Sequence, residues 1–522
     1  GLSWIVCLKE LILRPKYQIK IRMRRKTSLV ALLLMVSSST FAGGFLTNTN
    51  QNILFLRNPA RDAAIAIDGV YSNPAGVSFM KPGWHLSLNI QSAYQTRTST
   101  GTYAISNFHP AVDGLKPFSM GIGNRQDGVK EFEGKAKAPV VPSMQLAYVG
   151  DKWTFSASMA VTGGGGKCKF DDGLGTFESQ VAMIPVLSSL LLPGVTGYTM
   201  NSLVEGRQYY YGLQLGAGYR FNDHFSAFVG GRLIYADCNY YGYIKNIQME
   251  VGGHVVPAGA AFQQAGYPNF AGLVADRGLD CDQSGWGFTP ILGVDYKIGK
   301  WNFAAKYEFK TRVRLENKAN NTSGVDEYDD GRVLAADIPA ILTLGAQYEI
   351  LPTLRASVGY HYFFDKQATQ YNHRERELAG GGNEVLVGLE YDINKRITAS
   401  IGAQNTAYGL GDDSEFISDM SFVTSSTSVG LGVGVRLNPK MNLNVAYFKT
   451  FYRSYTKNMK DYNNLKENLM TQMGQLAGGN LNPQELQALQ EIGGRMQNAE
   501  FKGRDVFDRT NDVFGIGLDI SF

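Results

Sequence analysis

The sequence predicts an all-β protein, a transmembrane antiparallel β-barrel of about fourteen strands with an N-terminal plug (hatch) and partly helical outer loops. Three observations carry this prediction. From residue 84 onwards, segments with one apolar face recur, very short turns alternate with long connections, and the chain ends on a strand whose last residue is Phe522. In that last strand, Phe514, Ile516 and Leu518 fall on one face, while small or polar residues fall on the other. A greasy face repeated in this way predicts lipid outside the barrel and a polar or small-residue interior.

The first 42 residues are expected to lie outside the fold. Met23 is followed by three basic residues, by the apolar run 29–36 and by small residues up to Ala42. This order is typical of a secretory signal peptide at 23–42, with cleavage after Ala42. We expect residues 1–22 to be an over-extended start that is not translated.

The basic character of the chain belongs largely to this leader. Residues 1–42 hold eight Lys or Arg and one acid, so removing them takes away seven net positive charges and turns the formal charge of +4 into −3. Nucleic-acid binding therefore loses its compositional support, and no nucleic-acid partner is expected.

Six connections are tight and carry Gly, Pro, Asn or Asp, the residues that form hairpin turns. They are 149–152, 221–224, 298–300, 350–353, 392–395 and 437–440. Seven longer connections lie between them, near 99–138, 167–204, 246–283, 318–332, 366–380, 410–421 and 457–508. Short turns on one side and long loops on the other are typical of outer-membrane barrels, which predicts the strands of an 84–522 barrel and both termini on the short-turn side.

Two of the outer loops are unusual. Residues 181–195 are apolar, and residues 458–502 read as two amphipathic helices. Apolar surface on an outer loop suggests a landing site for a hydrophobic ligand. The alternative is that the helices pack on one another over the barrel mouth.

Residues 43–83 show no strand-like alternation and precede the first strand. Because a barrel of about fourteen strands is too wide for its own side chains to close, we expect this segment to be a hatch inside the lumen.

Three cysteines remain after the leader, namely Cys168, Cys238 and Cys281. The favoured pair is Cys238–Cys281, at the two ends of one long expected loop. Closing about 43 residues would stabilise the fold by on the order of 4 kcal/mol in the chain-entropy model. Three unpaired or buried thiols are the alternative.

Several stretches resemble, in order, the FadL/TodX family of outer-membrane transporters for hydrophobic compounds. The hatch position holds Ser72-Asn73-Pro74-Ala75-Gly76, and later matches are 141–146, 216–222, 337–339 and the final Phe522. The resemblance covers essentially the whole mature chain. It implies passive transport of hydrophobic small molecules, with long-chain fatty acids as the expected cargo and neutral aromatic hydrocarbons as an alternative.

The resemblance also implies the transport site. Phe45 and Leu46 would lie at an apolar pocket, and the turn formed by Asn73, Pro74 and Ala75 would take part in hatch movement. In the family the third strand kinks inward and leaves a lateral gap. Here the third expected strand runs into Gly163, Gly164, Gly165 and Gly166, and glycine in a strand marks bulges and bends. The alternative is that the strand simply ends there. Candidate cations for a carboxylate head group are Arg207, Arg220, Arg232 and Lys306.

Rival functions fit the sequence less well. The histidines lie scattered, without the Ser/His or Asp/His spacing of a barrel enzyme and without metal-ligand spacing, so we expect no enzyme, metal or cofactor. A diffusion porin needs an open lumen, which the expected hatch argues against. An adhesin is an alternative that the long loops do not exclude. Expected partners are lipopolysaccharide and phospholipid of a Gram-negative outer membrane, and the barrel-assembly machinery through the strand ending in Phe522. A monomer is expected.

Overall fold

The computed structural model describes residues 45–123, 127–321 and 326–522. The expected signal peptide at 23–42 and the expected untranslated segment at 1–22 lie outside these residues. In the described chain no helix is long and apolar enough to span a membrane.

In the described residues, eighteen strands form one sheet, and fourteen of them close into an antiparallel barrel through the pairing of the first strand with the last. The fourteen are β1 (Gly83–Ser106), β2 (Lys130–Val149), β3 (Trp153–Phe170), β4 (Val195–Arg220), β5 (Phe225–Val251), β7 (Arg277–Ile298), β8 (Trp301–Glu308), β11 (Ile341–Leu351), β12 (Leu354–Phe363), β13 (Gly382–Asp392), β14 (Ile397–Ala407), β15 (Ser426–Asn438), β16 (Met441–Tyr452) and β18 (Glu500–Ser521). Four short additional strands are β6 (His254–Pro257), β9 (Arg314–Asn321), β10 (Val333–Ala335) and β17 (Tyr455–Met459). The expected barrel class and all six tight turns are confirmed.

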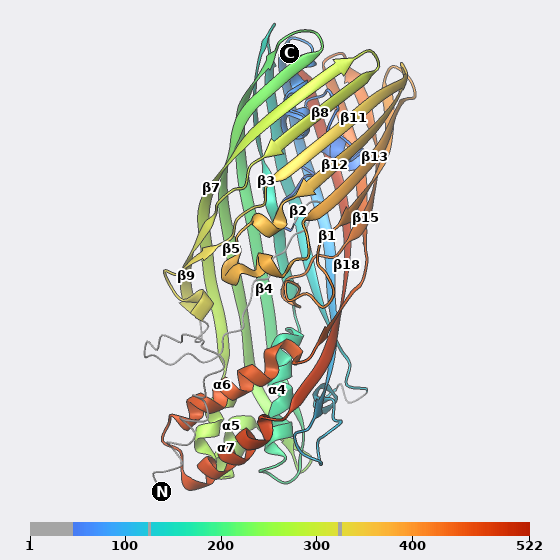
Figure 1. Cartoon of the computed structure of the whole chain (residues 1–522). Helices are drawn as coiled ribbons and strands as arrows, with labels where there is room; N and C mark the ends of the chain where they lie inside the picture. The colour runs from blue at the N-terminus through green and yellow to red at the C-terminus, as the bar shows by residue number, and fades with distance from the viewer. Residues whose placement is uncertain (1–44, 124–126, 322–325) are drawn as a thin grey trace.

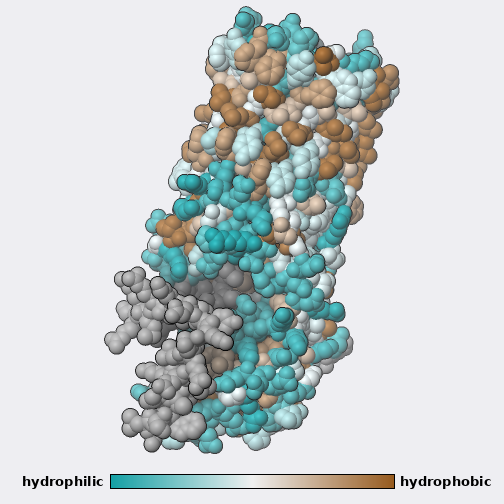
Figure 2. Space-filling model, in the orientation of Figure 1, coloured by the Kyte–Doolittle hydropathy of each residue, from teal (hydrophilic) through white to brown (hydrophobic). Residues whose placement is uncertain are grey.

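The strands alternate as the sequence predicts. On β1 the outward residues Leu88 and Ile90 are 44% and 47% exposed, while the inward residues Ser87 and Asn89 are buried. Figure 2 shows the resulting apolar belt over the half of the barrel that carries the short turns, and a hydrophilic surface beyond it. The belt is the part of the wall that faces lipid.

The wall is much taller on one side than on the other (Figure 1). The neighbouring strands β18, β1 to β5 and β7 have 18 to 27 residues, whereas the opposite strands β8 and β11 to β16 have 8 to 13. The long strands continue well past the apolar belt, so the long connections are shorter than the sequence suggested. Connection 99–138, for example, shrinks to the residues between Ser106 and Lys130.

Helices and short helical turns fill the outer end. They are η2 (Pro117–Met120), α4 (Gly175–Ser188), α5 (Ala258–Gln264), η3 (Pro268–Val274), η4 (Asp326–Tyr328), η5 (Asp365–Gln367), η6 (Tyr371–Glu377), η7 (Tyr462–Asn464), α6 (Leu465–Ala477) and α7 (Pro483–Met496). The two helices expected in 458–502 are α6 and α7. α4 is largely apolar from Val181 onwards, with Val181, Met183 and Val186 buried.

The apolar loop 181–195 therefore does not form an exposed landing surface. Instead α4 packs into one core with the apolar faces of α6 and α7, through Leu465, Leu469, Leu489 and Ile492. This arrangement matches the alternative in which the amphipathic helices pack on one another. Short helices on water-facing loops are stabilised mainly by burial of their apolar faces.

The predicted disulfide is absent, since Cys238 and Cys281 are both free, as is Cys168. The sequence placed Cys238 and Cys281 at loop ends, but both lie within paired strands. Cys238 faces Gln283 across the ladder and Cys281 faces Tyr240, a diagonal offset of two residues. Diagonal neighbours are about 7–8 Å apart, farther than a disulfide usually spans.

Candidate functional site

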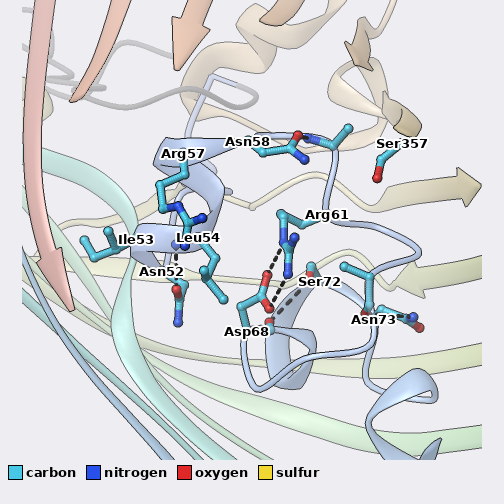
Figure 3. A network of polar contacts seen from close by, with 12 residues as sticks. Asn52, Ile53, Leu54, Arg57, Asn58, Arg61, Asp68, Ser72, Asn73 and Ser357 are labelled. Atoms are coloured by element: carbon cyan, nitrogen blue, oxygen red, sulfur yellow. Dashed lines mark hydrogen bonds and ion pairs between the residues drawn. The ribbon is translucent and has the colours of Figure 1, made fainter. Parts of the chain in front are cut away.

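Residues 45–82 lie inside the barrel as three short helical pieces, α2 (Ile53–Arg57), α3 (Gly69–Ser72) and η1 (Gly76–Phe79). Figure 3 shows the polar contacts that hold this hatch together. Asn52 caps α2 by accepting from the Leu54 N–H at 2.8 Å, and Arg61 pairs with both oxygens of Asp68 at 2.7 and 3.0 Å. These contacts fold a segment too short to build a core of its own.

Buried charges and amides fasten the hatch to the wall. His361 on β12 lies between Asp62 of the hatch, at 2.9 Å, and Glu384 of β13, at 2.7 Å. Arg57 donates to Asn444 at 2.6 Å and to Ser400 at 2.8 Å. These contacts join the hatch to β12, β13, β14 and β16, and so define its orientation in the lumen.

The Asn73-Pro74-Ala75 turn binds the wall near the short turns. Asn73 Nδ2 donates to Asp295 at 2.6 Å, and Ser226 Oγ donates to the Ala75 carbonyl at 2.8 Å. Pro74 lies beside Gly293. The structure thus separates this turn from the other predicted site residues, which gather elsewhere around β3.

Phe45 and Leu46 line a small internal cavity of about 60 Å³. Phe45 is buried, and its ring lies 4.8 Å from Tyr408 and 4.6 Å from Phe416, measured between ring centroids. Leu378 and Val423 add to the apolar lining, with Arg374 and Glu375 at one side. A cavity of this size holds a few waters, so a larger hydrophobic ligand must displace side chains.

The four glycines belong to β3, and the strand does not end at Gly163. The pairing between β2 and β3 stops at Met144↔Met159 and resumes at Lys137↔Lys167. On the other side, β3 pairs with β4 through two bulges, between Val161 and Gly163 and between Gly164 and Gly166. The sheet is therefore interrupted between β2 and β3 where the glycines lie, as bulged glycine strands permit.

Glycine is required at the centre of this interruption. A Cβ on Gly163 would collide with the Leu46 carbonyl, and Gly164 has a φ of +70°. The close approach brings the start of the hatch against the kinked strand.

Asn48 completes this contact. Its N–H donates to the Thr162 carbonyl at 2.9 Å, and its side-chain amide donates to the carbonyls of Gly164 at 2.9 Å and Val161 at 3.3 Å. A hatch residue thus binds three carbonyls in the part of β3 where the ladder with β2 is interrupted.

An apolar cavity of about 650 Å³ lies on the membrane face beside the interruption. Both rims of the gap line it, Pro142 and Met144 from β2 and Met159 and Val161 from β3, together with Leu88 of β1. From the lumen outward through the wall, the order is therefore the internal pocket, hatch residues 46–48, the interrupted pair of β2 and β3, and the apolar cavity on the membrane face. We call this last cavity the apolar groove.

The four candidate cations are paired or exposed. Arg232 and Lys306 are buried and both bind Glu308, at 2.6 and 2.7 Å. Arg207 forms an ion pair with Asp237 at 3.1 Å, and Arg220 donates to the Asp151 carbonyl near a turn.

Two arginines that face the lumen were not among the residues predicted from the sequence. Arg97 of β1 and Arg509 of β18 lie directly opposite one another and are 1% and 6% exposed. Arg509 donates to Gln95 at 3.0 Å and lies 4.9 Å from the Tyr452 ring centroid. Inward-facing positions can be read from the alternation of β1 and β18, but their burial depends on the loops that cover them. Asn48 was also missed, although the polar run Thr47 to Asn52 is a signal for a segment facing backbone groups.

No family model matches the sequence, and no curated protein matches it. The fold is similar to the crystal structure of a Pseudomonas aeruginosa FadL homologue, with a TM-score of 0.57 and 12% identity over 92% of this chain and 100% of that chain. Weaker likenesses include the Ralstonia pickettii toluene transporter TbuX, with a TM-score of 0.48 and 13% identity over 91% and 99% of the two chains. The P. putida toluene transporter TodX has a TM-score of 0.45 and 14% identity over 88% and 94%.

The closed antiparallel barrel agrees with the first of these comparisons. The chain has the fold of the Pseudomonas aeruginosa FadL homologue.

Proposed function

We propose that this protein carries hydrophobic small molecules passively across a bacterial outer membrane and releases them sideways between β2 and β3. One observation supports the proposal above all others. The sheet is interrupted between 138–143 and 160–166, and this interruption lies between the Phe45 pocket and the apolar groove on the membrane face.

The lateral route avoids the free-energy cost of exposing a hydrophobic molecule to water. A long alkyl chain loses about 0.8 kcal/mol per CH₂ when it leaves an apolar environment for water. A path through the hatch toward the short turns would end in water and would cross buried ion pairs such as Asp62–His361. A path through the gap ends among lipid tails and is closed by Leu46 and Asn48 of the hatch.

We propose long-chain fatty acids as the cargo. Arg97 and Arg509 place two like charges face to face in a buried site. An anionic head group would relieve their repulsion and accept charge-assisted hydrogen bonds. The alternative cargo is a neutral aromatic hydrocarbon, which the Phe45, Tyr408 and Phe416 rings could contact without any help from a cation.

The route is tested by cross-linking the gap. Cysteines replace Pro142 and Val161 on its two rims and are joined by oxidation or a short thiol cross-linker. Uptake of labelled oleate is then measured in cells that lack their own fatty-acid transporter. We expect the open pair to support uptake and the linked pair to reduce it to the level of cells without the barrel.

A second pair, Thr96→Cys with Thr510→Cys, is the matched control. These threonines face one another across the closed seam of β1 and β18, 2.7 Å apart at their hydroxyls, so linking them leaves the gap open. Equal uptake with both linked pairs would contradict the lateral route. No uptake by any folded, heat-modifiable variant would contradict fatty-acid transport itself.

The cargo is tested by charge removal. Arg509→Met should lower oleate uptake and spare uptake of toluene, since only the anion depends on the guanidinium. Arg220→Met, which removes a half-buried arginine beside a short turn, serves as the control. A parallel loss of both cargoes would argue against recognition of the carboxylate.

A further inference from the structure

One irregular segment separates the Phe45 pocket from a second cavity nearer the outer end. In the described chain, residues 411–423 between β14 and β15 form neither helix nor strand. The second cavity has a volume of about 100 Å³ and is lined by Thr176, Lys457, Asp461 and their neighbours. We call residues 411–423 the partition segment.

The partition segment contributes side chains to both cavities. Glu415, Ser418 and Met420 line the outer cavity. Phe416, Ser421 and Val423 line the inner one, where Phe416 packs against Phe45. Arg374 of η6 also lines both cavities, so the partition segment and the Arg374 side chain are the parts that the two spaces share.

A buried carboxylate ties the partition segment to α4. Asp419 is fully buried and accepts from the Thr176 N–H and from the Thr176 hydroxyl, each at 2.7 Å. Thr176 lies in the first turn of α4, where backbone N–H groups lack helical partners. A carboxylate at this end also suits the helix dipole.

The other fastenings come from side chains of neighbouring elements. Lys457 of β17 donates to the Glu415 carboxylate at 2.8 Å and to the Ile417 carbonyl at 3.1 Å. Tyr455 donates to the Gly411 carbonyl at 2.9 Å, and Arg374 donates to the Phe416 carbonyl at 2.9 Å. Side-chain contacts of this kind can open without breaking the barrel's strand ladders.

We propose that the partition segment is a gate between the outer cavity and the Phe45 pocket, latched to α4 through Asp419 and Thr176. Opening moves Phe416 off Phe45 and joins the two cavities, giving a hydrophobic molecule of larger size a way to the pocket. The inference rests on the proposed function for its purpose, because a gate serves a cargo.

The gate can be tested without measuring transport. Val423 lines the inner cavity, so Val423→Cys reports access to that cavity through its rate of labelling by a small water-soluble maleimide. The full barrel is used in detergent or liposomes, and the slow background of the parent protein is subtracted. Removing the latch with Asp419→Ala should raise the labelling rate about tenfold or more, since hydrogen bonds to a charged group shift an opening equilibrium by that order.

Asp412→Ala is the matched control, because Asp412 is an exposed acid of the same segment and should leave the rate unchanged. Thr176→Val removes the hydroxyl and keeps the backbone N–H, so it should give an intermediate rise even if Asp419→Ala folds poorly. Equal labelling of the Thr176→Val, Asp412→Ala and unsubstituted proteins would overturn the gate. Faster labelling together with absent uptake would keep the gate and contradict the proposed transport function.

Discussion

At the scale of single residues, the candidate site depends on the close approach of the hatch backbone to the backbone of β3. Gly163 lies against the Leu46 carbonyl, and Asn48 supplies donors to carbonyls of β3 that β2 does not reach. The interruption in the sheet is therefore not a row of bare polar groups in contact with lipid. It is closed from inside by hatch residues 46–48.

Gly163→Ala should displace the start of the hatch. Its new methyl group would collide with the Leu46 carbonyl, a backbone atom that cannot move alone. We expect faster proteolysis or labelling of residues 45–48 and altered uptake, with the barrel still heat-modifiable. Gly494→Ala on α7, where nothing lies within 4 Å of the added atom, should change neither property.

His361→Ala should lower stability strongly. Without the imidazole, the buried carboxylates of Asp62 and Glu384 lose their shared partner, and breaking a buried pair costs about 3–5 kcal/mol. The urea midpoint of the purified barrel should fall accordingly. His254→Ala, at an exposed histidine, should leave the midpoint in place, and an unchanged midpoint for His361→Ala would show that the clamp is not needed.

At the scale of elements, the outer end is organised around a pair of buried acids. Asp419 reaches the first turn of α4, and Asp505 of β18 accepts from the Tyr462 hydroxyl at 2.7 Å. Lys457 lies opposite Asp505 on β17 and pairs with Glu415, while Asn463 also contacts the site. Burial and the neighbouring Asp419 raise the pKa of Asp505 to about 7.

This pair predicts a pH dependence. Burial raises the pKa of both Asp419 and Asp505, so the folded state keeps a proton on this pair of carboxyl groups well above pH 3.9, near which an ordinary aspartate releases it. The folded state thus binds more protons over this range, so the local stability falls as pH rises from about 4 to 7 and is level above. Hydrogen-exchange protection at the start of α4, corrected for intrinsic rates, should be greater at pH 5 than at pH 8. Asp505→Asn removes one member of the coupled pair and should reduce the difference, and an undiminished difference in this variant would point to another group.

The elements also show how far the sequence could be read. The tight turns and membrane portions of the strands follow from alternation of apolar and polar residues. The outer halves of the long strands could not be placed, because outward positions such as Thr96 and Thr98 on β1 are polar there and lose the apolar signal. The same extension moved Cys238 and Cys281 from expected loop ends into paired strands.

The candidate site also has a part that could be predicted from the sequence and a part that could not. Phe45, Leu46 and the glycines of 163–166 could be anticipated from the resemblance, and the structure gathers them around the interrupted strand pair. The burial of Arg97 and Arg509 and the partition segment could not, because each depends on loops from distant parts of the sequence meeting above the hatch. No spacing rule in one sequence records such meetings.

At the scale of the whole molecule, the belt fixes the orientation in a bilayer. Trp84, Trp153 and Trp301 all point outward near the short turns, at 49%, 55% and 44% exposure. Aromatic residues at such positions form a girdle at the membrane interface.

Tryptophan fluorescence should report this arrangement. Reconstitution in lipids with brominated acyl chains should quench much of the emission, whereas aqueous iodide should quench little, since the outward indoles lie among lipids. A barrel whose emission responds mainly to iodide would contradict the placement of the belt.

The tall side of the wall has a consequence for where capture takes place. β5 runs for 27 residues, roughly 90 Å of strand, of which a tilted membrane crossing needs only about 9–11 residues. On the proposed route, the remainder would lift the entrance tens of ångströms above the lipid. Capture at that height would give a hydrophobic molecule a sheltered conduit above the membrane surface, and the proposed lateral exit would then return it to lipid.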